Sequence, residues 1–169
     1  MLLRETFLSP QSKTNCIKII AWIGSNQQRF DELVNLFLND EYRIVQRAAW
    51  PLSEVVRKNP RLIKKHLGKI LGYVNQPGLH GAVKRNTVRL LQDIDIPEKF
   101  HGKVMNLCFD YLISPDEKPA VKAFSLTVLD NLSKQYPEIK QELKTTIEDR
   151  WDFETAAFHA RAKKILKHL

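Results

Sequence analysis

The sequence predicts an all-α protein in which pairs of helices repeat along the chain. Three observations predict this fold: apolar stripes at helical spacing, a regular period of about 38 residues, and a proline opening the second helix of each pair. Together they predict nine helices, which form four antiparallel pairs followed by one final helix, and no strand.

The period is seen most clearly in the first helix of each pair. Three segments, which begin at Glu41, Leu79 and Glu117, align with one another at a constant offset. Three apolar slots recur in all of them: Val45, Val83 and Val121; Leu52, Leu90 and Val128; Val56, Ile94 and Leu132. Three shared positions in three copies indicate a structural repeat.

The second helix of each pair follows a proline. Pro60, Pro97 and Pro137 lie within one residue of the same repeat position. Proline is favoured at the first position of a helix, where its missing N–H would have no partner anyway. An apolar face follows Pro60, made of Ile63, Leu67, Ile70, Leu71 and Val74. Each unit is therefore predicted to be helix, short turn, helix, short turn.

The two ends of the chain depart from the period. The first pair, after Ser9, aligns with the next pair at a distinctly shorter offset than the later pairs do. The last helix carries Phe158, Ala162, Ile165 and Leu169 on one face and basic residues elsewhere, as a capping helix should. We predict one domain over residues 1–169, with repeats at about 9–39, 40–78, 79–115 and 116–152 and a capping helix at 153–169.

Pro51 interrupts the helical segment "VQRAAWPLSEVVRKNP". Proline inside a helix costs about 3 kcal/mol or more. Leu52, Val55 and Val56 nevertheless keep the helical phase of the residues before the proline. We therefore predict a kinked but continuous helix. The alternative is a helix that ends at Ala49 and restarts at Leu52.

The chain resembles the HEAT-repeat family of α-solenoids. The resemblance rests on "DEYRIVQRAAWPL" and "DEKPAVKAFSLTVL", with "GAVKRNTVRLL" as a weaker copy, and covers about residues 10–169. It implies a right-handed α-α superhelix of about four helical hairpins and a C-terminal capping helix. In that family the first helix of a unit is often bent at a proline, which agrees with the position of Pro51.

No catalytic or metal-binding motif accompanies the repeat. The five histidines lack metal-ligand spacing and are expected to be surface imidazoles. Cys16 and Cys108 form no CxxC pair, and buried free thiols in a reducing cytoplasm are expected. Trp22, Trp50 and Trp151 are expected to pack between helices, the alternative being exposed stacking platforms.

The N-terminus lacks the long apolar core of a signal peptide, and no apolar run approaches the ~18 residues that span a bilayer. We therefore expect a cytoplasmic, non-enzymatic protein without a metal, a cofactor or a membrane partner.

Net charge is the unusual feature of the composition. The chain has a formal charge of +8, and residues 42–112 hold 13 Lys and Arg against 5 Asp and Glu. The repeat predicts that basic residues of adjacent second helices form a binding patch: Arg61, Lys65, Lys69, Lys99 and Lys103. A second basic ladder is predicted on the first helices: Arg47, Lys84 and Arg85.

These features favour a non-enzymatic scaffold that presents a curved helical surface with a central basic patch to an acidic protein partner. Binding of nucleic acid is the alternative, because a basic surface also attracts phosphates. Some HEAT-like proteins are DNA glycosylases for alkylated bases, but no carboxylate here aligns with a catalytic slot. A third interpretation is a solvated basic face without a partner.

Overall fold

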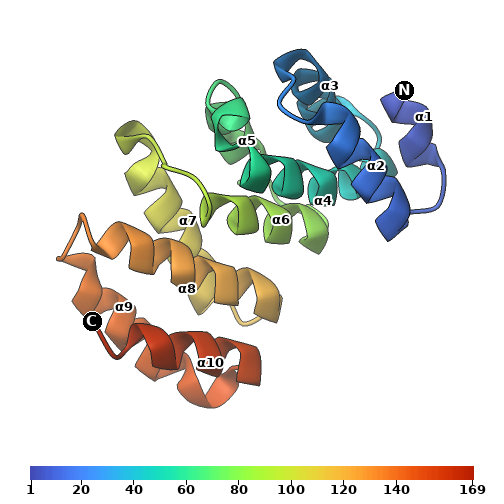
Figure 1. Ribbon diagram of the computed structural model, residues 1–169. Helices are drawn as coiled ribbons and strands as arrows, with labels where there is room; N and C mark the ends of the chain where they lie inside the picture. Colours follow the sequence, from blue (N-terminus) through green and yellow to red (C-terminus); the bar gives the residue numbers. More distant parts are fainter. The chain divides into compact units, whose positions relative to one another are not determined.

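The computed structural model describes residues 1–169 and contains only helices (Figure 1). The α-helices are α1 (Leu3–Leu8), α2 (Lys13–Ile23), α3 (Gln27–Asn39), α4 (Tyr42–Lys58), α5 (Leu67–Val74), α6 (Gly81–Leu91), α7 (His101–Ile113), α8 (Pro119–Ser133), α9 (Ile139–Arg150) and α10 (Ala156–Ile165). Three short 3₁₀ helices are η1 (Pro60–Ile63), η2 (Glu98–Phe100) and η3 (Trp151–Phe153). The all-α prediction is confirmed. The predicted count of nine helices is wrong, because α1 precedes the first expected pair.

The chain divides into two compact units, Met1–Asp95 and Ile96–Leu169. Unit 1 contains α1 to α6, and its largest fully buried side chains include Phe30, Phe37, Leu33, Ile44, Leu52, Ile63, Leu67 and Ile70. Unit 2 contains α7 to α10, and its fully buried side chains include Val104, Leu112, Leu126, Leu129, Leu143 and Phe158. Each unit thus has a hydrophobic core of its own. A single domain over residues 1–169 remains a prediction.

In each unit, a helix that begins one of the predicted pairs lies at the centre of the packing. In unit 1, α4 packs against α2, α3 and α6, and in unit 2, α8 packs against α7 and α10. The slots that define the repeat lie at these contacts, because Leu52, Leu90 and Val128 are all buried. Burial of equivalent positions is what a stack of similar helical units requires.

Helix α4 runs through Pro51 without interruption from Tyr42 to Lys58. The alternative of a helix that ends at Ala49 is therefore wrong. Pro51 offers no N–H to the Arg47 carbonyl four residues earlier. Its ring is buried and lines a narrow pocket together with Phe7 and Ile19. The proline thus fills core space as well as breaking one rung of the helical hydrogen bonds.

Pro51→Ala is expected to lower the free energy of unfolding by about 1 kcal/mol. Removal of two buried ring carbons costs about 0.8 kcal/mol each, and the restored hydrogen bond returns part of this loss. Urea denaturation measures the change. Pro119→Ala is the matched control, because Pro119 is exposed at the first position of α8. Equal effects at both sites would contradict a packing role for the Pro51 ring.

The segment after Pro60 is not the single helix that the apolar stripe predicts. Residues 60–63 form η1, a turn follows, and α5 begins only at Leu67. The turn closes by i→i+3 bonds, from the Lys64 N–H to the Arg61 carbonyl at 3.4 Å and from the His66 N–H to the Ile63 carbonyl at 2.8 Å. Basic residues along this segment therefore do not share one helical face.

Candidate functional site

Unit 1 carries a stretch of exposed basic residues that contains no acidic residue. This 57–69 basic segment spans the last turn of α4, η1, the following turn and the start of α5. Its basic members are all exposed: Arg57, Lys58, Arg61, Lys64, Lys65 and Lys69. The segment contains three of the five residues of the predicted patch. These three residues do not lie on one continuous helix, because η1 ends at Ile63 and α5 begins only at Leu67.

Two members of the segment have acidic partners. The Lys65 Nζ lies 2.6 Å from an oxygen of Asp31, and the Arg57 guanidinium lies 2.6 Å from Glu54. Desolvation of Asp31 opposes its ionisation, but hydrogen bonds from Lys65, Gln27 and His66 outweigh it and lower the pKa of the Asp31 carboxyl well below its usual range. The segment therefore contains two cations that already have acidic partners, although Glu54 is shared with Arg89.

The other four members have no ion-pair partner: Lys58, Arg61, Lys64 and Lys69. Exposed and uncompensated, these side chains keep their full charge toward solvent. Four like charges within a short stretch of chain produce a positive local potential, which attracts anionic groups.

Unit 2 contains the remaining members of the predicted patch. Lys99 lies in η2 and Lys103 in the first turn of α7, and both side chains are exposed. The Lys99 ammonium lies 5.0 Å from the centre of the Phe100 ring, within the range of a cation–π contact. All five residues of the predicted patch are therefore exposed, three in unit 1 and two in unit 2.

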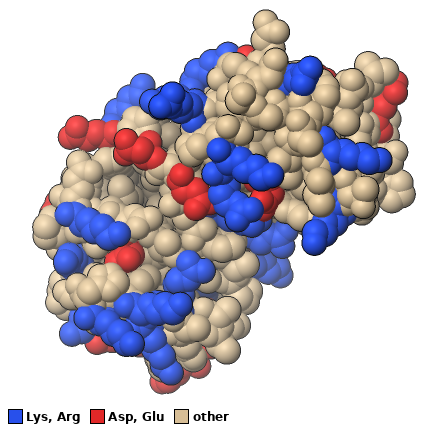
Figure 2. Space-filling view, in the orientation of Figure 1, with Lys and Arg blue, Asp and Glu red and all other residues tan.

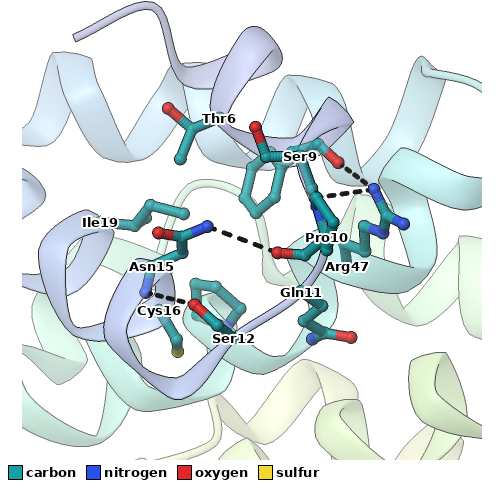
Figure 3. A pocket seen from close by; sticks show the side chains of 11 residues that line it. Thr6, Ser9, Pro10, Gln11, Ser12, Asn15, Cys16, Ile19 and Arg47 are labelled. Atoms are coloured by element: carbon teal, nitrogen blue, oxygen red, sulfur yellow. Dashed lines mark hydrogen bonds between the residues drawn. The ribbon is translucent and has the colours of Figure 1, made fainter.

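The three residues of the predicted basic ladder differ in their exposure to solvent. Arg85 is exposed on α6, whereas Lys84 and Arg47 are half-buried. The Arg47 Nη1 donates to the carbonyls of Phe7 at 2.6 Å, Leu8 at 3.1 Å and Ser9 at 2.9 Å. Figure 3 shows this guanidinium directed at the chain that leaves α1. Arg47 thus joins the end of α1 to α4.

The pocket in Figure 3 lies between the α1–α2 connection and α4. Ser12 caps α2 by accepting a hydrogen bond from the Asn15 N–H at 3.0 Å, and the Asn15 side chain donates to the Pro10 carbonyl at 3.4 Å. Cys16 also lines the pocket. Desolvation, aided by the Glu54 carboxylate, raises the pKa of its thiol to about 11. A thiol that remains protonated at neutral pH is a weak nucleophile and a weak metal ligand.

The structure also shows where the cysteines and histidines of the sequence lie. Cys108 is buried, as is Cys16, and neither is in a disulfide, which confirms the prediction of buried free thiols. The expectation of surface imidazoles is wrong for His101, which is buried and bonded to the Ile96 carbonyl and the Tyr136 hydroxyl.

The structure contains no group of three residues able to hold a metal ion. None of its helices combines the length and the apolar character that crossing a membrane requires.

The three tryptophans are half-buried. The guanidinium of Arg29 lies 4.9 Å from the centre of the Trp22 ring, and Trp151 stacks on His159 with ring centres 4.3 Å apart. Both rings therefore use a face for contacts within the protein, as the packing prediction expects.

A second basic surface was missed by the charge count. Figure 2 shows Lys and Arg side chains gathered over α10. This helix exposes Lys163, Lys164 and, just beyond its end, Lys167. Acidic residues elsewhere in the sequence cancel these charges in a count along the chain, although they need not be close to them in space.

A protein-family model matches nearly the whole chain. A family model described as "HEAT repeat domain" matches residues 3–169. Searches of curated proteins and of solved structures found no match.

Proposed function

Because the chain belongs to the HEAT repeat domain family, we propose that it is a non-enzymatic binding module whose exposed basic residues receive an acidic segment of a partner protein. HEAT repeats typically act as helical scaffolds for protein interactions, in which stacked helices offer an extended surface.

The observation that supports this proposal best is the set of uncompensated cations in the 57–69 basic segment. An exposed ion pair contributes only about 0–1 kcal/mol, so a single lysine would not specify a partner. Several cations on neighbouring turns act together, and they also speed association with a partner of opposite charge. Lys99 and Lys103 add exposed positive charge on unit 2.

A specific observation favours protein over nucleic acid as the partner. Proteins that bind single-stranded nucleic acid combine basic grooves with aromatic rings on which bases stack. Trp22 and Trp151 each engage a ring face with a neighbouring side chain of this protein. An acidic polypeptide needs only the positive charge, which the surface supplies.

Charge reversal of the 57–69 basic segment tests the proposal. Arg61→Glu with Lys69→Glu is expected to weaken binding of a fluorescent polyglutamate peptide at least tenfold, about 1.4 kcal/mol. The matched control is Lys13→Glu with Lys18→Glu, which changes the net charge equally at two exposed positions on α2.

The same test is made in unit 2. Lys99→Glu with Lys103→Glu is compared with the control pair Lys134→Glu and Lys144→Glu, which alters exposed positions just after α8 and on α9. Equal weakening by the test and control pairs would mean that only net charge matters.

The same protein preparation is tested for binding of nucleic acid. Random single- and double-stranded oligonucleotides are titrated in a gel-shift assay at about 50 mM salt, where phosphate contacts are strong. If four cations neutralised duplex phosphates, the log–log slope of affinity against salt would be about −3.6, at about −0.9 per phosphate. Oligonucleotide binding with that slope, lost in the Arg61/Lys69 variant, would replace the acidic protein by nucleic acid as the partner class.

A further inference from the structure

The end of α1 and the first two turns of α4 border an open hollow of about 430 Å³ in unit 1. The side chains that define it come from both helices: Phe7, Leu8, Tyr42, Arg43, Ile44 and Arg47. A volume in this range suits a ligand or a few residues of a peptide. The 57–69 basic segment contributes no residue to its lining.

Apolar side chains make up part of the lining of the hollow. Phe7 and Ile44 are buried at its base, whereas Leu8 is 52% exposed and Tyr42 is 61% exposed. Large apolar side chains at the edge of a hollow leave apolar surface in water, and covering that surface is favourable. An apolar side chain of a partner would gain this burial.

Positive charge lies beside the apolar surface. Arg43 and Arg47 are four residues apart on α4 and therefore lie on the same helical face. Arg43 is exposed and makes no ion pair. Arg47 contacts the α1 carbonyls through Nη1 alone, so its Nη2 and Nε remain available. The hollow also contains one carboxylate, that of Glu41, so the two guanidiniums exceed the acidic groups of the lining by one positive charge.

We propose that this hollow is a docking site for a partner peptide that carries a bulky apolar side chain next to a carboxylate. The apolar side chain packs between Leu8 and Tyr42, and the carboxylate pairs with Arg43 and with the open edge of Arg47. This site is separate from the 57–69 basic segment and does not depend on it. Charge complementarity favours an acidic partner over a second copy of this basic chain.

Backbone amide NMR of the full chain tests the site. The probe is a short synthetic peptide with one phenylalanine between glutamates, and the matched probe carries lysines in place of the glutamates. The acidic peptide is expected to shift the amide signals of Leu8, Tyr42, Arg43 and Ile44 in a saturable manner. The lysine peptide is expected to leave these signals in place.

Two variants and two controls complete the test. Tyr42→Ala and Arg43→Glu are each expected to weaken binding of the acidic peptide about fivefold or more, as loss of a central contact or reversal of a charge should. Phe153→Ala and Lys18→Glu alter exposed positions outside the hollow and are expected to retain the affinity of the unaltered protein. Circular dichroism confirms that each variant is folded.

Three outcomes would overturn the proposal. Signals that move only within residues 57–69 would remove the hollow but leave the proposed function intact. Equal binding of the lysine peptide would remove the acidic partner. Signals in the hollow that shift with protein concentration alone, accompanied by dimers in sedimentation, would make a second copy the occupant.

Discussion

Glu154→Gln is expected to lower the free energy of unfolding by about 3–5 kcal/mol, the usual cost of leaving one buried charge without its partner. Glu154 and Lys122 are almost fully buried, with side chains 4% and 3% exposed, and the Lys122 Nζ lies 2.5 Å from the Glu154 Oε1. Arg150 also donates to this oxygen, at 3.0 and 3.1 Å. Neutral glutamine would leave the Lys122 ammonium buried without a countercharge.

Urea denaturation measures this change, with Glu148→Gln as the control, because Glu148 is exposed on α9. Adding Lys122→Met to Glu154→Gln should recover part of the lost stability, since the double change removes both buried charges. A loss of less than about 1 kcal/mol in Glu154→Gln would place the pair among ordinary exposed ion pairs and contradict its burial.

Removal of α10, from Ala156 to the end of the chain, is expected to abolish cooperative unfolding of unit 2. This helix buries Phe158, Ala162 and Ile165 and packs against α8. Loss of one buried phenylalanine side chain alone costs about 3–5 kcal/mol, which is a large part of the total stability of a small domain. The exposed face of α8 would then promote aggregation.

Thermal melting and size-exclusion chromatography measure the effect of the truncation. Lys163→Ala with Lys167→Ala is the control, because it alters only exposed side chains of the same helical region. A truncated protein that remains monomeric with an unchanged melting curve would refute the capping role of the last helix.

The repeat fold could be predicted because its signal is periodic in the sequence. The slot occupied by Leu52, Leu90 and Val128 is buried in the structure, as the alignment of the repeats predicts. By contrast, α1 has only six residues, too few to be stable alone. It is held by burial of Leu3 and Phe7 and by the bonds from Arg47, and all of these depend on tertiary structure.

The candidate site was predictable only in part, because some of its features also depend on tertiary structure. Exposure of Arg61 and Lys103 follows from their positions opposite the apolar stripes, and the structure has both exposed. The pairing of Lys65 with Asp31 joins residues 34 apart in the sequence, and the burial of Lys122 depends on Glu154, 32 residues later. Such pairs leave no periodic signal, so the sequence alone did not reveal them. The hollow was missed because α1 forms one of its sides.

Zero-length carbodiimide cross-linking of the full chain to a polyglutamate peptide tests most directly whether the exposed basic residues receive an acidic partner. The reagent joins a carboxylate to a lysine amine only when the two groups are in contact, and peptide mapping identifies the lysine. We predict cross-links at Lys58, Lys64 and Lys69, with further ones at Lys99 and Lys103. Cross-links concentrated at Lys163, Lys164 and Lys167, or spread evenly over all exposed lysines, would contradict binding by the 57–69 basic segment.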